Sequence, residues 1–511
     1  MYRRVIPFVC LLAISGILCA QAPPPGWHKH YTDSLQGVRS DEALHLLAKH
    51  PRHKAKEIIV GIIDSGVDTT SVNLRPAFWN NPKEKMNGRD DDKNGYVDDL
   101  HGWNFLGTTD GTFNMTSAGT EEYREFKRLY PKYKNADSSS VENPKEFAYY
   151  EEMKKKAGIV NYIKYTNYTA MKHQAYHYLD SVLGQMPDIS KDTLTIRGMM
   201  LLPMPDDTWA AACNTLLADF YQADKSQRWE QLVKKNDDQL ELMKTRLRGI
   251  EKDPDKHLLI DNEPDNPLHR FYGNATLQTE GCEHGTGVAG AIAGQGIGHP
   301  EAAGVYPKAR LMILRAAADG DEYDKDVASA IRYAVDNGAK VINMSLGKYT
   351  SPQAGMVNEA IAYAASKDVL IIQAAGNNHL NVDSVAYFPS AIDKKGKRFD
   401  NFLRVGASDA QGRLSSFSNY GATHVDVLAP GETITTVMPG NEYAPVDGTS
   451  ISAPIVSGVA AMLRAYFPKL KAADIKQILI QTARHPQQEG LSATGVIDAE
   501  AAVRSAMNYK Q

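Results

Sequence analysis

The stretch IIVGIIDSGVD, residues 58–68, decides the fold that the sequence predicts. Its run of apolar, mostly β-branched residues ends at Asp64 and Gly66. Such a run indicates a strand buried on both faces, as in a parallel sheet. We therefore expect the Asp64 carboxylate at the carboxyl end of a central strand.

Strand-like and helix-like segments alternate from Cys282 onward. The strand-like segments are ARLMILRAA (309–317), KVINMSLG (340–347) and VLIIQAAGN (369–377), and the helical ones are VASAIRYAVDNG (327–338) and MVNEAIAYAASKD (356–368). Alternation at this spacing predicts an α/β fold with a doubly wound, mostly parallel sheet and helices on both faces. Ligands of such sheets bind outside the carboxyl ends of the strands.

Residues 108–265 interrupt this pattern with a segment rich in tyrosine and lysine that has helical periodicity. Apolar residues recur on one face of its last predicted helix, which Gly249 is placed to cap: Trp229, Leu232, Val233, Leu240, Met243 and Leu247. We expect a helical insertion that divides one domain into residues 58–107 and 266–511. The insertion is either a substrate lid or partner-binding module, or a unit whose apolar helix face only packs against the main domain or its own helices.

Composition excludes one class of partner. The chain has 511 residues, 42% of them hydrophobic, which is enough for a large domain and a second unit. Its 57 basic and 61 acidic residues give a formal net charge of -4. Because this balance provides no basic footprint, we expect no nucleic-acid partner.

The N-terminus predicts export. Arg3 and Arg4 precede an apolar run that is too short to span a membrane and that ends near Ala20, before a proline cluster. We expect a signal peptide over residues 1–20, a short segment over 21–57, and no membrane span in the mature chain. Lipidation of Cys19 is the alternative, which the bulky Leu18 disfavours. Periplasm, cell surface and medium remain open as destinations.

The cysteines exclude a disulfide framework. Cys10 and Cys19 lie in or beside the predicted signal peptide, which leaves Cys213 and Cys282 in the mature chain. One bridge between this pair stays open.

Four short motifs carry groups that would together make a nucleophilic site. GIIDSGVD (61–68) contains Asp64, GCEHGTGVAGAIAG (281–294) contains His284, IIQAAGNN (371–378) contains Asn377, and DGTSISAPIVSG (447–458) contains Ser450 and Ser452. A serine hydroxyl becomes a nucleophile only with a base, a group that orients the base, and donors for the oxyanion. Taken singly, these residues are more simply a turn carboxylate, a helix-start histidine and a helix cap.

In this chain order the motifs resemble those of the subtilisin-like serine peptidases, the subtilases. The resemblance implies a subtilisin-like fold and an exported serine endopeptidase that cleaves polypeptides and needs no cofactor for catalysis. It implies a catalytic triad of Asp64, His284 and Ser450, an acyl-enzyme on Ser450, and Asn377 as oxyanion donor. Ser452 corresponds to a supporting position.

The same resemblance implies a peptide-binding cleft. NMSLG (343–347) resembles the strand to which an extended substrate adds, and AAGN (374–377) resembles the facing wall of the primary pocket, with small residues that leave room for a side chain. The substrate-binding residues implied are Ser345, Leu346, Gly347, Ala374, Ala375 and Gly376. The alternative is that both stretches are only buried strand ends.

The chain departs from the family pattern in three places. Gly287 stands where the family commonly has a second histidine, and Lys348 follows SLG, where a small residue is frequent and where a charge would influence subsite preference. Asp64 and His284 are 220 residues apart, much farther than in compact subtilases. They meet only if the insertion leaves and re-enters the domain at neighbouring points.

GRDDDKNGYVDDLHGWNF (88–105) predicts a cation loop. Asp90, Asp92 and Asn94 alternate ahead of Gly95, and Asp98, or alternatively Asp99, supplies a further carboxylate, which is the oxygen-rich pattern of a calcium loop. His101 occupies the place of the usual closing glutamate, so a solvated acidic turn is the alternative. We expect calcium here only as a structural ion.

Two functional alternatives stay open at the level of sequence. One is a binding or scaffold protein on a peptidase fold whose site is shielded by the insertion. The other is an esterase or transpeptidase that uses the same acyl-enzyme. Substrate preference and oligomeric state are not predicted by any of these patterns.

Overall fold

A computed structural model describes residues 23–50, 54–139, 141–191, 193–203, 206–250, 255–484 and 494–509. The predicted signal peptide, residues 1–20, lies outside the described residues. Among the helices described, none is both long and apolar enough to cross a membrane.

A seven-stranded sheet forms the centre of the molecule, and all of its strand pairs are parallel. Its strand order is β2-β4-β1-β6-β7-β8-β9. The strands are β1 (Ile59–Asp64), β2 (Gly102–Asn104), β4 (Arg310–Arg315), β6 (Val341–Met344), β7 (Leu370–Ala374), β8 (Phe402–Ser408) and β9 (Val427–Pro430). The predicted doubly wound α/β fold is confirmed.

Strand β1 lies between β4 and β6 and directs its side chains into two separate cores. Val60 and Ile62 belong to the core that contains helices α9 (Glu283–Ala293) and α12 (Thr449–Tyr466). Ile63 belongs to the core on the other face, with α10 (Asp324–Asp336) and α11 (Ala354–Ser366). The strand order reverses at β1, which is where ligands of doubly wound sheets bind.

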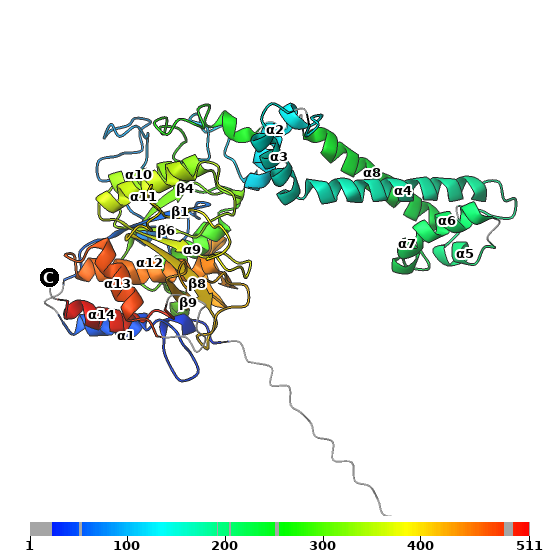
Figure 1. Ribbon diagram of the computed structural model, residues 1–511. Coiled ribbons are helices and arrows are strands. Elements are labelled where there is room, and N and C mark those ends of the chain that lie inside the picture. Colours follow the sequence, from blue (N-terminus) through cyan, green and yellow to red (C-terminus); the bar gives the residue numbers. More distant parts are fainter. Residues whose placement is uncertain are drawn as a thin grey trace, which may run out of the picture.

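Further elements surround this sheet (Figure 1). They are α1 (Ser40–Ala48), α13 (Ala472–Gln481), α14 (Ala499–Met507), the antiparallel pair β10 (Ile434–Met438) and β11 (Glu442–Val446), and the short 3-10 helices Trp27–Lys29, Arg75–Ala77, Lys256–Leu259, Pro300–Ala302 and Pro439–Asn441. A small parallel pair joins β3 (Ser117–Gly119) to β5 (Asp319–Gly320).

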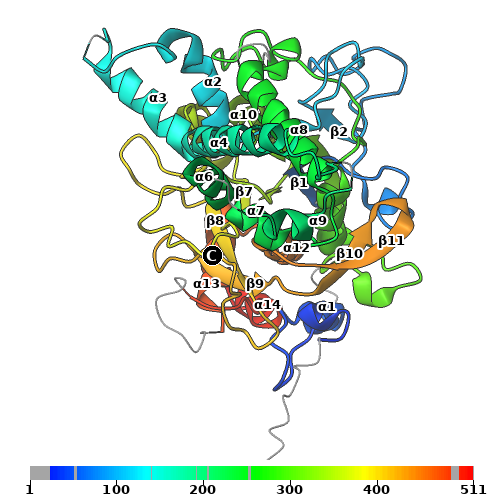
Figure 2. The ribbon, with the colours of Figure 1, turned by 90° about the vertical axis from the view of Figure 1, so that its right-hand side faces the viewer.

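Helices α2 to α8, residues 121–249, form an arm that projects from the sheet domain (Figures 1 and 2). They are α2 (Glu121–Tyr133), α3 (Pro144–Lys156), α4 (Ile159–Leu183), α5 (Ile196–Met200), α6 (Asp207–Thr215), α7 (Leu217–Gln222) and α8 (Trp229–Gly249). The long helices α4 and α8 pack against each other, and α5, α6 and α7 gather at the far end. The arm is built mainly on itself, with two small apolar cores of its own.

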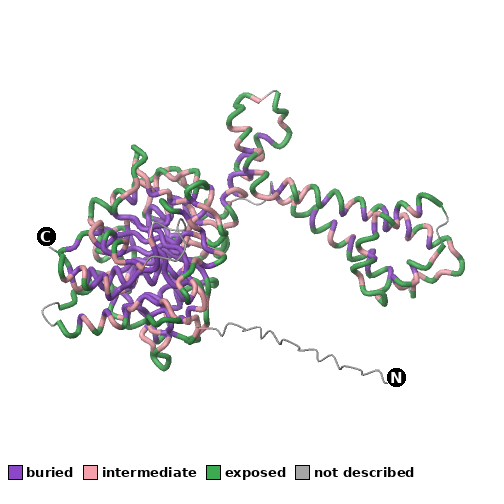
Figure 3. The backbone as a smooth tube through the Cα atoms, turned by 60° about the horizontal axis from the view of Figure 1, so that its bottom comes forward, coloured by how far each residue is buried: buried purple, intermediate pink, exposed green. Residues whose placement is uncertain are grey.

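Buried residues are concentrated in the centre of the sheet domain, and the arm has fewer of them, between its own helices (Figure 3). In α8 the residues Trp229, Leu232, Val233, Leu240 and Met243 are buried, as their spacing predicts, while Leu247 is half-buried. Gly249 is the last helical residue rather than the residue after it.

Cys213 and Cys282 are both free thiols, so the bridge that the sequence left open does not form. Cys213 lies in α6 at the end of the arm, and Cys282 immediately precedes α9 in the sheet domain.

Candidate active site

Asp64 ends strand β1 and is almost fully buried, with 2% of its surface exposed. Its Oδ1 accepts a hydrogen bond from the backbone N–H of Ser65 at 2.7 Å and lies 2.7 Å from Nδ1 of His284. Its Oδ2 is buried and has no partner within the described chain. The Ser65 N–H therefore helps to fix the carboxylate beside the imidazole.

His284 stands in the first turn of α9, and 48% of its side chain is exposed. The neighbouring carboxylate of Asp64 raises the pKa of His284 above 6.5, and burial opposes this effect. Gly285 lets the helix start come this close, because a Cβ at that position would lie 2.0 Å from the carbonyl oxygen of Gly66. Asn104 and Asn274, on either side of the insertion, form an antiparallel bridge, so the insertion leaves and re-enters the sheet domain at neighbouring points.

Ser450 is the second residue of α12, after Gly448 with φ 141, a conformation that favours glycine. A Cβ at Gly448 would lie 2.9 Å from Ser450 Oγ and 3.4 Å from Asn377 Nδ2, so hydroxyl and amide flank this glycine. Within the described residues no hydrogen bond joins Ser450 to His284, and catalytic contacts of this kind are often looser without substrate.

Asn377 follows β7 and its side-chain amide is oriented by Thr449. Its Oδ1 accepts hydrogen bonds from Thr449 N at 2.9 Å and from Thr449 Oγ1 at 2.8 Å. The same hydroxyl accepts a bond from Gly376 N at 3.0 Å. Because the oxygen is held in this way, the Nδ2 donors face the Gly448 side and remain available for an oxyanion. The sequence patterns do not assign this orienting role to Thr449, although the residue lies in the same motif as Ser450.

Ser452 has a different environment. It is fully buried in α12, and its hydroxyl donates to the carbonyl oxygen of Pro430 at 3.1 Å. This is a packing role, as the resemblance implied for Ser452.

A cavity of about 580 Å³ adjoins Asp64 and His284, whereas Ser450, Asn377 and residues 374–376 are not among its lining residues. Asp64, His284 and Ser345–Gly347 contribute to its lining, and Ala318–Gly320 contribute from the other side. Ser345 Oγ donates to the carbonyl oxygen of Ser450 at 2.7 Å, which ties this wall to α12. The cavity is the candidate substrate cleft.

The second predicted wall differs from the expectation that small residues leave room there. Ala374 and Ala375 are buried, and Gly376 is half-buried. A Cβ at Gly376 would lie 3.1 Å from the phenol oxygen of Tyr387, and a Cβ at Gly347 would lie 2.5 Å from the same atom. The tyrosine therefore occupies the space beside both glycines, and at Gly376 the Nδ2 atom of Asn419 would lie closer still, at 2.4 Å.

Lys348 does not present a free charge to the cleft. Its side chain is buried, donates to Glu121 and to the carbonyl oxygen of Glu322 at 2.5 and 2.7 Å, and lies 3.1 Å from Asp324. The expected influence on subsite preference is therefore replaced by an anchor for the base of the arm, because Glu121 begins α2.

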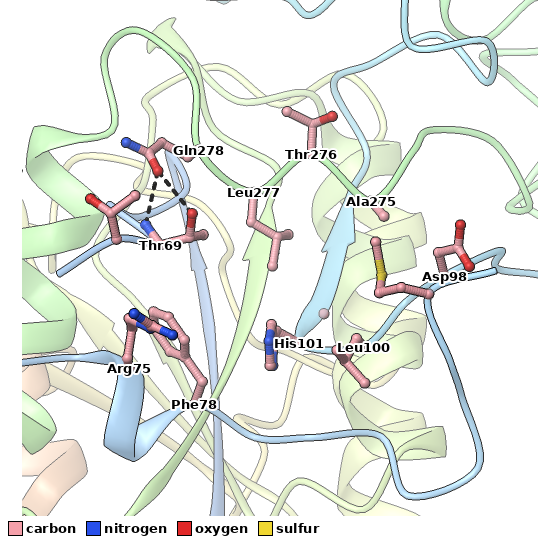
Figure 4. Close-up of a pocket in the computed structure, with 13 residues that line it drawn as sticks. Thr69, Arg75, Phe78, Asp98, Leu100, His101, Ala275, Thr276, Leu277 and Gln278 are labelled. Carbon is pink, nitrogen blue, oxygen red and sulfur yellow. Dashed lines mark hydrogen bonds between the residues drawn. The ribbon is translucent and has the colours of Figure 1, made fainter. Parts of the chain in front are cut away.

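A slightly larger cavity, about 610 Å³, lies between the loop after β1 and the start of β2 (Figure 4). Phe78, His101 and Gln278 are among its lining residues, and none of the predicted catalytic residues is. Gln278 Oε1 already accepts two hydrogen bonds from Thr69, and His101 Nδ1 lies 2.8 Å from the carbonyl oxygen of Trp79. Size alone therefore does not identify the reactive cavity.

The carboxylates of the predicted cation loop differ in their partners: Asp90 and Asp98 accept hydrogen bonds from backbone N–H groups of the loop, whereas Asp92 lies in a cluster of carboxylates. Asp90 accepts hydrogen bonds from the backbone of Asn94 and Gly95, and Asp98 accepts from Asn87 and Gly88.

Asp92, in contrast, gathers with Glu84 and Asp99, with one ligand atom of each within 4.8 Å of the others. Glu84 is 5% exposed and its Oε2 has no partner in the described chain. Burial raises the pKa of Asp99 to about 6. Of the predicted ligands only Asp92 belongs to this cluster, together with Asp99, the alternative to Asp98, whereas Glu84 was not predicted.

Comparison with known proteins identifies the family. The profile of the Subtilase family matches residues 55–497. This chain is a member of the subtilase family. It is 38% identical over 213 residues to a thermophilic serine proteinase of Bacillus sp. (strain AK1), covering 42% of this chain and 48% of that protein. It is 36% identical over 228 residues to subtilisin BL of Lederbergia lenta, covering 44% of this chain and 79% of that protein.

The matched region thus spans about half the length of the thermophilic proteinase. Among solved structures, the prenylagaramide maturation protease PagA aligns with 45% of this subtilase and 83% of that chain, at 29% identity and a TM-score of 0.39.

Proposed function

We propose that this subtilase is a serine endopeptidase that hydrolyses peptide bonds through an acyl-enzyme on Ser450. The observation that carries the proposal is the His284–Asp64 pair at 2.7 Å beside a cleft whose Ser345 wall bonds to Ser450. A buried carboxylate on Nδ1 leaves Nε2 as the proton acceptor that a serine nucleophile requires.

In the first step, Ser450 Oγ attacks the substrate carbonyl carbon while His284 Nε2 takes the hydroxyl proton. Asp64 holds the imidazole tautomer and stabilises the imidazolium. The carbonyl oxygen becomes an oxyanion, to which Asn377 Nδ2 and the backbone N–H of Ser450 at the start of α12 would donate. His284 then protonates the leaving amine, and water cleaves the ester by the same steps in reverse.

Export by residues 1–20 is part of the proposal. Arg3, Arg4 and the short apolar run that follows them support it. The test is the N-terminal sequence of the protein recovered from a secreting host, where cleavage near Ala20 is expected and an intact Met1 in the cytoplasm would contradict export.

The scaffold alternative requires an inaccessible site. The half-exposed side chain of His284 argues against shielding. Esterase or transpeptidase chemistry differs in which acyl donor enters and which nucleophile resolves the acyl-enzyme, so product analysis with peptide, ester and amine substrates separates these reactions.

A fluorophosphonate probe tests the nucleophile, with mass spectrometry of the labelled peptide. We expect labelling at Ser450 that is lost in Ser450→Ala and retained in Ser452→Ala, the matched control on the same helix. Labelling of Ser452, or no labelling of the intact protein, would overturn the assignment.

We also propose a structural calcium ion in the cation loop. The oxygen donors of Glu84, Asp92 and Asp99 suit calcium, and the unpartnered, buried Oε2 of Glu84 provides a carboxylate oxygen for it. Millimolar calcium is expected to raise the melting temperature of the inactive Ser450→Ala protein, and Glu84→Gln is expected to reduce that rise. An unchanged melting temperature with both calcium and chelator would contradict the site.

A further inference from the structure

The arm carries a cluster of metal-ligand side chains outside the catalytic domain. His173 and His177 lie one turn apart on α4, and Asp237 lies opposite them on α8. One ligand atom from each of the three lies within 4.8 Å of the others. The two imidazole ring centroids are 4.2 Å apart.

Both imidazoles face the same carboxylate. His173 Nδ1 lies 2.7 Å from Asp237 Oδ1, and His177 Nε2 lies 2.9 Å from that oxygen. Between 35% and 48% of each side chain is exposed, so an ion could enter from solvent. The ion pair of Lys172 with Asp219, also in the arm, differs because a lysine ammonium has no lone pair to offer a metal ion.

We propose that His173, His177 and Asp237 bind a divalent transition-metal ion of the zinc class. Tetrahedral zinc ligands at 2.0–2.1 Å are about 3.4 Å apart, so small rotations of these side chains would suffice. Two imidazoles and a carboxylate suit Zn²⁺ or Co²⁺ better than Ca²⁺. Three protein ligands leave a coordination position for water.

The ion links the two long helices of the arm. Because α4 and α8 pack against each other, an ion held by ligands from both helices ties them together. An ion that binds only the folded arm stabilises it by mass action. The site is therefore structural for the arm and separate from the acyl-transfer chemistry.

The test uses the untagged full-length chain with Ser450→Ala, stripped with EDTA and titrated with Co²⁺. We expect one Co²⁺ per chain with visible d–d absorption, displaced by Zn²⁺. His177→Ala and Asp237→Asn should each weaken binding more than about tenfold. The matched control is His299→Ala, because His299 pairs with a single carboxylate, Glu301, at 3.0 Å.

Hydrogen exchange provides a second readout that needs no variant. Zn²⁺ should slow exchange in the middle of α4 and α8. Absence of the Co²⁺ spectrum, or equal affinity in His177→Ala, Asp237→Asn and His299→Ala, would overturn the proposal and leave a histidine–aspartate salt bridge only.

An independent observation concerns substrate choice and rests on the proposed peptidase function. Both cleft walls are tied to the nucleophile: Ser345 bonds to the carbonyl of Ser450, and Asn377 bonds to Thr449. A substrate residue whose carbonyl carbon reaches Ser450 would place its side chain near Gly347 and Gly376, the glycines of these two stretches. The phenol oxygen of Tyr387 lies there, 2.5 Å from a Cβ built at Gly347.

Tyr387 is held in that position. Its ring is buried and lies 5.3 Å from the guanidinium of Arg404. The next residue, Phe388, pairs with Lys348, and its carbonyl oxygen accepts a hydrogen bond from Gln373 at 3.0 Å. No hydrogen bond of the Tyr387 hydroxyl occurs among the described residues, so the hydroxyl is free to meet the substrate.

We infer that Tyr387 closes the primary pocket and restricts the residue before the scissile bond to Gly, Ala or Ser. A larger side chain would require displacement of a tyrosine that three neighbouring segments fix. Steric exclusion of this kind discriminates between substrates more strongly than one missing methylene does.

Peptide p-nitroanilides that differ only at this residue test the inference. The unmodified enzyme should show a kcat/KM at least about tenfold higher for Ala and Ser than for Leu and Phe. Tyr387→Ala should raise kcat/KM for Phe, Tyr387→Phe should keep the preference for Ala, and Tyr363→Ala on the outer helix α11 is the matched truncation control.

The fluorophosphonate probe separates the two possible failures, because it carries no side chain for this pocket. Labelling at Ser450 together with equal rates for Ala and Phe would overturn the pocket inference alone. Absence of labelling would overturn the peptidase proposal and the inference with it. The comparison of substrates on the unmodified enzyme decides the inference even if Tyr387→Ala fails to fold.

Discussion

The sheet domain and the arm bury their apolar residues in different ways. The sheet domain has two extensive cores, one on each face of the sheet, and each includes alternate residues of the central strand β1. The arm has two small clusters between its own helices. The proposed catalytic groups Asp64, His284, Asn377 and Ser450 stand on or next to elements of the sheet domain, so the chemistry should be sensitive to changes there and insensitive to changes in the arm.

The largest expected effect comes from Asp64→Asn. The variant keeps the shape of the side chain but removes the charge that raises the pKa of His284. We expect kcat to fall by about ten-thousandfold, because an amide also favours the wrong imidazole tautomer.

The same variant has a pH signature. His284 must be neutral to act as a base, so activity rises with pH through a pKa above 6.5 in the unmodified enzyme. Removing the negative charge lowers that pKa, and the rising limb of log(kcat/KM) should move to lower pH in Asp64→Asn. A limb that stays in place would contradict the assigned pair.

Asn377→Ala should have the next largest effect. Loss of one oxyanion donor costs about a hundred- to a thousandfold in kcat with little change in KM. Steady-state kinetics on a peptide p-nitroanilide measure both constants. A change confined to KM would show that Asn377 binds substrate rather than the transition state.

Thr449→Val should have a smaller effect on the same step. It removes the hydroxyl that donates to Asn377 Oδ1 but keeps the backbone donor and the side-chain shape. Loss of one neutral hydrogen bond predicts about a three- to tenfold fall in kcat at constant KM. Thr449→Ser should restore kcat, and failure to do so would contradict the positioning role.

Trp229→Ala in the arm should leave catalysis unchanged. The tryptophan is fully buried, and truncation of such a side chain costs about 3–5 kcal/mol of stability. Hydrogen exchange should therefore rise across α4 and α8 while kcat/KM stays within twofold, about 0.4 kcal/mol. A large loss of activity would show that the two regions are coupled.

The sequence predicts best those elements and side chains whose positions depend on residues that are close together in the chain. The buried run at residues 58–64 predicts β1, and the motifs around Asp64, His284, Asn377 and Ser450 each lie within one strand end or helix start. The orientation of the Asn377 amide also has a local cause, because Thr449 is adjacent to Ser450 in the same motif.

The residues that the sequence does not predict depend on tertiary packing. Tyr387 reaches the space beside Gly347 and Gly376 from a loop that shares no motif with either glycine. Glu84 joins Asp92 from outside the cation loop. Asp237 meets His177 across 60 residues of chain, which only the pairing of α4 with α8 brings together.

The acyl-enzyme on Ser450 is tested most directly by trapping it. The enzyme is quenched in acid while it turns over a peptide p-nitrophenyl ester, and the intact protein and its peptides are then analysed by mass spectrometry. The acyl-enzyme mechanism predicts an added mass equal to that of the acyl group, located on Ser450 and absent in Ser450→Ala. An acyl group on another residue, or turnover with no acyl group on the protein under conditions in which deacylation is slow, would contradict it.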